Sequence, residues 1–397
     1  MSISWELIFW VGIACIIYTF LGYGLLLFFL LKIKAFFTKT KGEFNNQNFQ
    51  PQVTFVIPAY NEERWIAQKI QNSLQLDYPS EKLHFLMVTD GSNDKTVEII
   101  NRFPIPEGIS FRHFHETPRN GKIAAVERIM PKINTPIAIF TDANAMINPS
   151  AIRNIVKYFE NPKVGVVAGE KRIQLQEKGD AAGAGEGIYW KYESFLKNLD
   201  AQFYSVIGAA GELFAIRTKL APKIPKDSII EDFFLTMTIA SKGYRIAYAP
   251  NAYAIEGQSA SVQEELKRKI RIAAGGFQAV SRLSRLFNIF KYGRLSFQFI
   301  SRRVFRWYVV PIVLPFVLIS NIYLAISNTK VYQYLLILQI GFYLLAFIGW
   351  LLERRQLRLK ALFIPYYFCM MHYAVYRGFL RFLKGNQSVL WERAKRA

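Results

Sequence analysis

Three long apolar runs and one central stretch of alternating pattern divide the chain. The first run covers 5–31, and two more, 307–327 and 331–352, follow one another late in the sequence. Each is about as long as, or longer than, the roughly 20 apolar residues with which a helix crosses a bilayer. We therefore expect three membrane-spanning helices, the last two forming a hairpin across the short polar break between them.

The charges around the first run predict its orientation. No Lys or Arg precedes it, and four lysines follow it: Lys32, Lys34, Lys39 and Lys41. Positive charge favours the cytoplasmic side, so the domain after this run is expected in the cytoplasm. Without a basic leader or a small-residue cleavage site, the run is expected to be a permanent anchor and not a signal peptide.

A further apolar stretch begins at Ala361 but is soon broken by His372, Arg377 and Arg381. If it crossed the membrane, the basic tail 391–397 would lie outside, against the charge rule. An interfacial or re-entrant segment is therefore expected here. The stretch 283–306 mixes phenylalanines with arginines and predicts amphipathic helices on the inner leaflet; a surface helix packed on the soluble domain is the alternative.

Between about residues 52 and 255, short β-branched or aromatic runs alternate with longer amphipathic ones, a pattern typical of strands alternating with helices. The expected strands are 53–57, 83–88, 110–115, 137–141 and 164–168, and the expected helices are 62–74, 95–102, 122–132 and 149–159. This order predicts an α/β fold with a largely parallel sheet covered on both faces. Ligands of such sheets bind beyond the carboxyl ends of the strands.

Acidic turns follow three of the predicted strands. Asp90 follows the second strand, Asp142 the fourth, and a Pro-Ala-Tyr-Asn-Glu-Glu turn the first. Each alone is explained equally well as a turn or a helix cap. Together they fit a nucleotide site with a divalent cation, because a carboxylate at Asp142 is the hard ligand that Mg²⁺ or Mn²⁺ prefers. Lys122, which opens a predicted helix, could reach the phosphates or remain solvated.

With these motifs the chain resembles the membrane-anchored glycosyltransferases of family 2, which have the GT-A fold, and among them the bacterial synthases of poly-N-acetylglucosamine, hyaluronan and cellulose. The resemblance covers about 52–276 and implies a nucleotide-sugar donor, such as a UDP-sugar. The residues that it implies in nucleotide binding are Pro58, Ala59, Tyr60, Glu62, Asp90, Lys122 and Asp142. Asp142 matches the first acid of the family's Asp-x-Asp metal motif, and Asn144 replaces the second, so the implied cofactor, Mg²⁺ or Mn²⁺, has one firm carboxylate ligand.

The same resemblance implies the catalytic residues. Asp232, in the Ile-Ile-Glu-Asp-Phe motif, is implied as the catalytic base of an inverting transfer. Two acids capping a helix explain this motif better when it is taken by itself, and the other motifs of the family in the same order reverse that preference. Gly211, Glu212 and Glu231 are implied on the acceptor side. The family's Gln-x-x-Arg-Trp element is only partly matched: Arg268 and Arg271 are implied in diphosphate binding, and Ile272 stands where processive members have Trp.

The charge of the chain indicates which kinds of binding partner to expect. Lys and Arg number 50 against 29 acids, a formal net charge of +21, which favours polyanionic partners such as phosphates or anionic lipid. The positive charges gather around the apolar runs, whereas the predicted site carries acids, so nucleic acid is not expected as a partner. Cys15 and Cys369 lie in apolar runs and are expected to be unpaired, and His113 and His115 are expected to be structural.

The expected organisation is an anchor at 1–34, a cytoplasmic GT-A domain at 50–276, interfacial helices at 277–306, a membrane hairpin at 307–352 and a basic interfacial segment with a tail at 353–397. The expected function is sugar transfer to a carbohydrate acceptor in cell-surface polysaccharide synthesis, by a multi-pass protein of the inner membrane. Transfer of a single sugar to a membrane lipid, and membrane-tethered polyanion binding without catalysis, are the alternatives.

Overall fold

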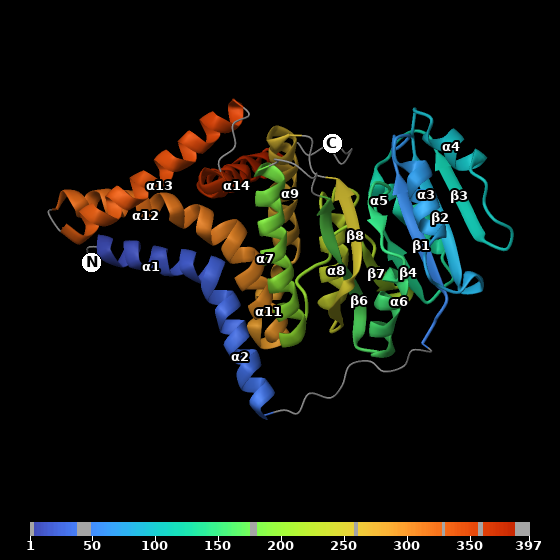
Figure 1. The fold of residues 1–397 in the computed structure, drawn as a ribbon. Helices are drawn as coiled ribbons and strands as arrows, with labels where there is room; N and C mark the ends of the chain where they lie inside the picture. Colours follow the sequence, from blue (N-terminus) through green and yellow to red (C-terminus); the bar gives the residue numbers. More distant parts are fainter. Residues whose placement is uncertain are drawn as a thin grey trace.

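The structure, a computed structural model, describes residues 4–37, 49–174, 181–257, 261–327, 330–355 and 360–385, and of residues 181–189 and 360 only the backbone. Its central domain is built on one mixed sheet with the strand order β3-β2-β1-β4-β7-β6-β8-β5 (Figure 1). The strands are β1 (Val53–Ala59), β2 (Leu83–Asp90), β3 (Ser110–Glu116), β4 (Ile137–Phe140), β5 (Met146–Ile147), β6 (Val164–Gln174), β7 (Phe214–Arg217) and β8 (Arg245–Gly257).

Helices cover both faces of this sheet, because its strands alternate between two apolar clusters. On β1, Phe55 and Ile57 pack with helices α3, α4 and α6, whereas Val56 packs with α5 and α8 on the opposite face. A side-chain period of two on a buried strand produces this division. The helices of the domain are α3 (Ile66–Leu74), α4 (Thr96–Arg102), α5 (Lys122–Ile129), α6 (Ala151–Val156), α7 (Ala181–Phe203), α8 (Glu231–Ala240) and α9 (Val262–Arg282).

The predicted α/β fold is confirmed, although two strands, β7 and the short edge strand β5, run antiparallel to their neighbours. Strands β3, β2, β1 and β4 run parallel, as expected, but β7 is antiparallel to both β4 and β6. The chain returns from the long helix α7 to the edge where β1 and β4 end, so β7 starts at that edge and runs back. Residues that precede β7 therefore lie beside residues that follow β1 and β4.

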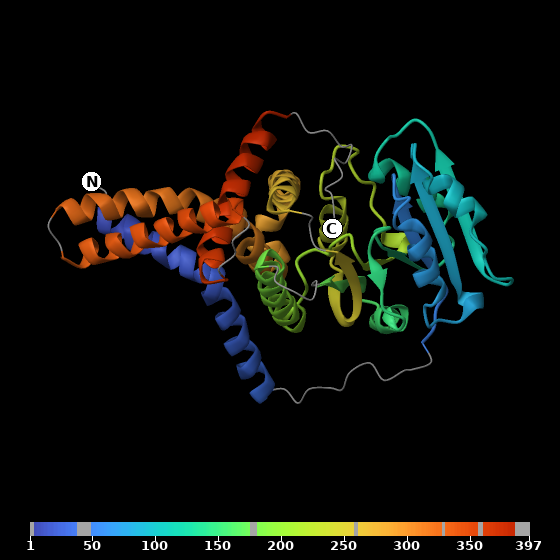
Figure 2. The ribbon, with the colours of Figure 1, turned by 45° about the horizontal axis from the view of Figure 1, so that its top comes forward.

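Three helices of the described chain are long and apolar enough to cross a membrane: Trp5–Phe37, Arg294–Ile326 and Lys330–Arg354. Their apolar parts, α1 (Trp5–Ile17), α12 (Val310–Ile326) and α13 (Lys330–Arg354), lie side by side and extend away from the sheet (Figures 1 and 2). Phe9 of α1 and Tyr332, in the first turn of α13, contact each other with ring centroids 5.6 Å apart. The polar break between the last two helices lies outside the described residues.

The N-terminal helix bends between its two halves. A π-helical turn, η1 (Tyr18–Gly22), joins α1 to α2 (Tyr23–Phe37), and the ribbon changes direction there (Figure 1). Tyr23, the first residue of α2, donates its hydroxyl to Asp200 of α7. The second half of the helix is thus attached to the central domain, and does not continue along the bundle.

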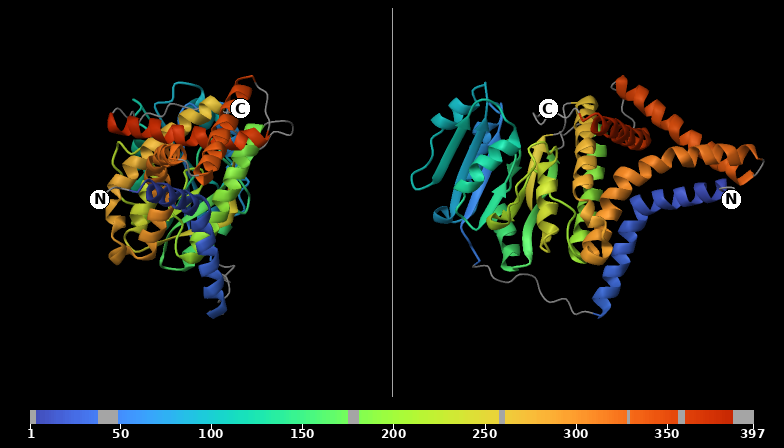
Figure 3. Two further views of the ribbon diagram at one scale, coloured as in Figure 1. Left: turned by 90° about the vertical axis from the view of Figure 1, so that its left-hand side faces the viewer. Right: turned by 180° about the vertical axis from the view of Figure 1, so that it is seen from behind.

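The expected segments 277–306 and 353–397 are divided differently. The boundary at 276 falls inside α9, and the boundary at 306 falls inside a helix that runs without a break through α11 (Arg294–Phe299), η7 (Ile300–Val309) and α12. Helix α14 (Lys360–Leu383) crosses the base of the bundle (Figure 3) and packs along α9. The expected basic tail 391–397 lies outside the described residues.

Candidate active site

Four segments of the chain meet at one edge of the sheet. Asp142 follows β4, Lys122 opens α5, Gly211 precedes β7, and Glu231 and Asp232 open α8. The Lys122 Nζ lies 2.8 Å from Asp142 Oδ1 and 3.1 Å from a carboxylate oxygen of Glu231. One ammonium therefore joins acids that are separated by almost ninety positions in the sequence.

Gly211 allows these side chains to converge. A Cβ atom at this position would lie 3.2 Å from Lys122 Nζ, 3.3 Å from Asp232 Oδ2 and 3.6 Å from Asp142 Oδ2. Backbone without a side chain is what permits the close approach of charged groups or of a ligand at this point. Lys122, Asp142 and Asp232 thus surround a single point.

Burial and charge set the protonation states in this cluster. Burial raises the pKa of Asp232 to about 7, with the adjacent Glu231 acting in the same direction and Lys122 against it. Although burial opposes it, the neighbouring carboxylates raise the pKa of Lys122 above its ordinary value, so this side chain remains protonated. Arg271 of α9 is also within electrostatic reach: burial lowers its pKa, and Glu231 and Asp232 oppose that effect.

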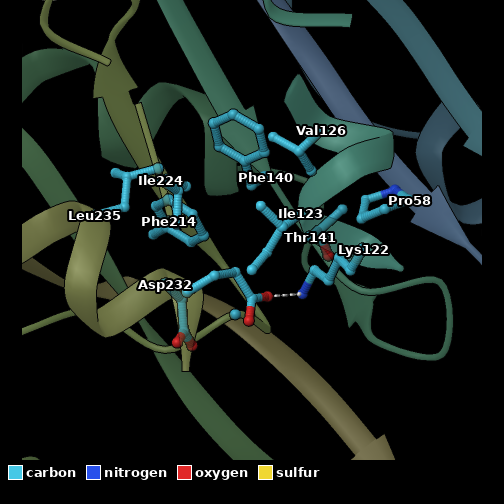
Figure 4. Close-up of a pocket in the computed structure, with 12 residues that line it drawn as sticks. Pro58, Lys122, Ile123, Val126, Phe140, Thr141, Phe214, Ile224, Asp232 and Leu235 are labelled. Atoms are coloured by element: carbon cyan, nitrogen blue, oxygen red, sulfur yellow. Dashed lines mark ion pairs between the residues drawn. The ribbon is translucent and has the colours of Figure 1, made fainter. Parts of the chain in front are cut away.

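A small pocket opens beside these charges. Lys122, Thr141, Glu231 and Asp232 line its polar side, and its apolar wall contains Phe140, Phe214, Ile224 and Leu235. Figure 4 shows Lys122 and Asp232 reaching this pocket from different elements, with the ion pair between Lys122 and Glu231 dashed. Pro58, at the end of β1, lies at its edge.

Asp90 positions the turn that carries Lys122. Its Oδ2 accepts hydrogen bonds from the backbone N–H groups of Asn120 and Gly121, and its Oδ1 accepts two from Arg128, each 3.1 Å long. Asp90 as a whole is 3 % exposed. The structure therefore links Asp90 to Lys122 through the backbone of one turn.

The Pro-Ala-Tyr-Asn-Glu-Glu turn extends from the same edge. Ala59 is buried as the last residue of β1, and the Tyr60 ring stacks against Arg119, whose Cζ lies 3.7 Å from the ring centroid. The Glu62 backbone N–H donates to Thr96 Oγ1 at 2.7 Å, which anchors the turn to α4. These contacts bring Tyr60 and the strand ends to one side of the domain.

Glu212 and Arg268, two further residues predicted from the sequence, form ion pairs with other protein side chains next to the cluster. Glu212 forms an ion pair with Lys171 of β6, which also pairs with Glu256 of β8, and Lys171 holds the pKa of Glu212 below its ordinary value although burial opposes this. Arg268 pairs with Glu265, three residues before it on α9. Among the candidates, Lys122, Asp142, Gly211, Glu231 and Asp232 form the centre.

Residues of the helix that contains η7 and α12 pack against the start of α8. Phe233, directly after Asp232, packs edge-on against Trp307 with ring centroids 5.8 Å apart, and the Arg303 guanidinium lies 5.1 Å from the Phe233 ring. Arg303 also donates to the Ile207 carbonyl at 2.8 Å. The helix that leads into the membrane therefore contacts the first turn of α8.

A family model described as glycosyltransferase like family 2 matches residues 51–275 of the chain. The chain is a family 2 glycosyltransferase. This match contains every segment that meets at the site, from the Pro58 turn to Arg271.

Relatives of this glycosyltransferase include poly-beta-1,6-N-acetyl-D-glucosamine synthases. The protein from Staphylococcus aureus strain COL is 26 % identical over 238 residues, which cover 58 % of this chain and 56 % of the relative. The protein from Staphylococcus epidermidis is 24 % identical over 267 residues, 65 % of this chain and 62 % of the relative. The chain thus spans little more than half the length of these relatives.

Among solved structures, this glycosyltransferase is similar to a mannosyltransferase from Pyrobaculum calidifontis in complex with GDP-Man and Mn²⁺. The similarity has a TM-score of 0.72, covers 96 % of this chain and 99 % of the other, and comes with 20 % sequence identity. It extends beyond the sheet to the membrane helices. The GT-A fold predicted from the sequence is confirmed.

The turn after β4 offers few protein ligands to a cation. Among the described residues no group of three or more His, Cys, Asp and Glu side chains is arranged to hold a metal ion. Asp142 nevertheless offers a carboxylate next to Lys122, and Asn144 lies half-buried in the same turn. A hard divalent cation with few protein ligands takes its remaining oxygens from phosphates and water.

The sequence did not predict three basic side chains that contact residues of this site and hold them in place. Lys69, Arg128 and Lys171 all contact site residues, and all come from elements other than the acidic turns. Only Lys69 had a visible signal: it lies on the face of α3 that also contains the buried Ile66, Ile70 and Ser73. A lysine on the buried face of an amphipathic helix indicates a specific partner.

Proposed function

We propose that this family 2 glycosyltransferase is an inverting enzyme that transfers a sugar from a nucleotide-diphosphate donor, such as a UDP-sugar, to a carbohydrate acceptor in cell-surface polysaccharide synthesis. The observation that carries the proposal is the convergence of Lys122, Asp142 and Asp232 around Gly211. A cation ligand, a phosphate-binding ammonium and a base of raised pKa are the groups that such a transfer needs. The synthases among the relatives support a polysaccharide product.

In this proposal Asp232 removes the proton from the acceptor hydroxyl. Lys122 and Arg271 bind the donor's diphosphate and balance the negative charge that develops there. Asp142, with Asn144, would hold the divalent cation, Mg²⁺ or Mn²⁺, which supplies further neutralisation of that charge. Glu231 keeps Lys122 in place, and Gly211 leaves room for the acceptor.

The membrane helices support a location at the inner membrane. Three candidate spans, with Lys32 and Lys34 after the first, favour a multi-pass protein whose catalytic domain lies in the cytoplasm, where nucleotide sugars are present. The partners proposed are the nucleotide-sugar donor, the acceptor and the bilayer.

Transfer of a single sugar to a membrane lipid is the second candidate. It is favoured by Ile272, which stands where processive members of the family have Trp. Incubating membranes that contain the protein with a panel of radiolabelled nucleotide sugars, then sizing the product, separates the two. We expect a labelled carbohydrate ladder; one sugar on an extractable lipid would favour the second candidate, and no labelled product with any donor would contradict both.

Activity is expected to depend on pH through Asp232. A carboxyl group whose pKa is raised to about 7 is protonated below that pH and accepts a proton only above it. The value of kcat/KM, which reports the free enzyme, should therefore fall about tenfold per pH unit below 7 and level off above it. Initial rates between pH 5 and 8.5 measure this, and a flat profile from 5 to 7 would contradict the role of Asp232.

Removal of divalent cations is expected to stop transfer. Treatment with EDTA should lower the rate roughly a hundredfold, because stabilisation of the diphosphate by a cation contributes several kcal/mol. Adding Mn²⁺ or Mg²⁺ in excess should restore the rate. A rate that EDTA leaves unchanged would show that Asp142 does not act through a metal.

A further inference from the structure

Lys69 is a buried lysine that the proposed transfer does not use. It lies in the middle of α3, is 0 % exposed, and has its ammonium 5.6 Å from the centroid of the Phe55 ring. Its neighbours on the buried face of α3, Ile66 and Ile70, belong to the apolar cluster under the sheet. Removing a lone ammonium from water costs several kcal/mol unless hydrogen bonds and charges compensate.

The compensating contacts lie on the two sides of one turn. Lys69 Nζ donates to Thr141 Oγ1 at 3.0 Å, directly before Asp142, and to the backbone carbonyl of Ala145, directly after Asn144. The Ala145 N–H in turn donates to the Asp142 carbonyl at 3.2 Å, which closes the turn. A single side chain therefore fixes both ends of the segment that contains Asp142 and Asn144.

The same contact extends to the acceptor side of the site. Thr141 Oγ1, which accepts from Lys69, donates to the Glu212 carbonyl at 2.9 Å. Glu212 follows Gly211, the residue around which Lys122, Asp142 and Asp232 converge. Lys69 thus holds the end of β4 in register with the chain that leads into β7.

The ammonium of Lys69 is better explained by the contacts that it makes to the turn than by a contribution to the stability of the fold. Burial lowers the pKa of Lys69 to about 7, whereas the nearby Asp142 and Glu256 act in the opposite direction. An apolar side chain of similar length would fill the space without the desolvation cost. It would leave the Ala145 carbonyl without this donor and the turn without its attachment to α3.

We infer that Lys69 is a positioning residue that holds the Asp142–Asn144 turn in the geometry in which it binds the donor's cation and diphosphate. This inference rests on the proposed function of that turn. Replacing a residue that hydrogen-bonds to metal-binding groups and orients them typically lowers metal affinity or activity 10–100-fold.

The test compares two variants on the same helix. Lys69→Met removes the ammonium at nearly constant volume. Asn72→Ala is the matched control, because the Asn72 amide makes two hydrogen bonds to the backbone of Ile147, at 2.9 and 2.8 Å, beyond the turn. Binding of Mn²⁺ in the presence of UDP, followed by the loss of the free Mn²⁺ signal in electron paramagnetic resonance, is measured on the full chain in detergent.

We expect Lys69→Met to weaken Mn²⁺ binding about 10–100-fold. Asn72→Ala should leave Mn²⁺ binding at the wild-type value, even if it lowers the melting temperature of the protein as much as Lys69→Met does. Wild-type affinity in Lys69→Met, or equal losses in both variants, would overturn the inference. Should Lys69→Met fail to fold, Thr141→Val removes the hydroxyl that accepts from Lys69, and is expected to weaken binding in the same direction.

Hydrogen exchange separates this inference from the proposed function. In the protein without ligands, the backbone amides of 141–145 should exchange faster in Lys69→Met than in the wild type and in Asn72→Ala. Unchanged exchange would overturn the inference whatever the enzyme transfers. A wild type that binds no nucleoside diphosphate with Mn²⁺ would instead contradict the proposed function, and the exchange rates would still decide whether Lys69 holds the turn.

Discussion

Replacing Asp232 with asparagine is expected to lower sugar transfer by about 10²–10⁴-fold, the usual contribution of a general base, and to leave donor binding intact. Asparagine has the shape of aspartate but cannot accept the proton of the acceptor hydroxyl. Lys122 should also keep its ion pairs with Asp142 and Glu231 in this variant, because neither of them involves the Asp232 carboxylate. Initial rates with the donor selected from the nucleotide-sugar panel, and calorimetric binding of the corresponding nucleotide with Mn²⁺, measure the two effects separately.

Asp227→Asn is the matched control for this variant. Asp227 lies in the loop before α8, five positions earlier, and pairs on the surface with Arg282, where its side chain is 61 % exposed. The same chemical change there is expected to leave the rate unchanged. Near-normal transfer by Asp232→Asn would remove the residue from the reaction.

Replacing Arg302 with methionine is expected to destabilise the protein by about 3–5 kcal/mol, because it removes one partner from a buried ion network. The guanidinium is 5 % exposed and bonds Asp200 at 2.9 Å and Glu193 at 3.1 Å, both on α7. Without it, the fully buried Asp200 retains hydrogen bonds from Tyr23 and Gln298 but no cation. Denaturant unfolding in detergent micelles gives the change in free energy.

A surface arginine provides the comparison. Arg153 forms a two-point contact with Asp77 in which the side chains are 39 % and 60 % exposed, so Arg153→Met is expected to cost at most about 1 kcal/mol. The double variant Arg302→Met with Asp200→Asn should recover part of the lost stability, because it also removes the unpaired charge. Equal stability of Arg302→Met and the wild type would show that this network does not attach the membrane helix to the domain.

Local pattern was enough to predict most of the fold. The expected strand 53–57 appears as β1 (Val53–Ala59), and the expected helix 95–102 as α4 (Thr96–Arg102), because alternation and helical spacing reflect burial directly. Strands β5, β7 and β8 were not predicted, and neither was the reversed direction of β7. Strand direction depends on where the chain returns after α7, which no local pattern records.

The arginines before the late membrane hairpin illustrate what sequence alone leaves open. In the sequence, Arg302 fits a basic helix on the lipid surface, whereas in the structure it is buried against α7. Its acidic partners lie about a hundred positions earlier in the chain. Pairings over such distances depend on the assembled fold, and the same applies to Lys69 and Thr141.

The acidic residues of the candidate site were predicted from the sequence, but the side chains that hold them in place were not. Asp142 stands in a turn whose polarity is visible beside an apolar run, whereas Asp232 was implied by the family motif. Lys122, whose ammonium contacts Asp142 and Glu231, looked equally like a solvated lysine, and only the structure brings it within 2.8 Å of Asp142. Motifs therefore indicated which residues carry charge, and packing determined which charges meet.

We propose that Lys122, Asp142 and Asp232 form a single donor site, and a crystal structure of the protein with UDP and Mn²⁺ tests this most directly. We expect an anomalous Mn²⁺ peak bound to the Asp142 carboxylate, with the diphosphate beside Lys122 and the Asp232 carboxylate facing the open side at Gly211. A nucleotide bound elsewhere on the domain, or a metal without contact to Asp142, would contradict it.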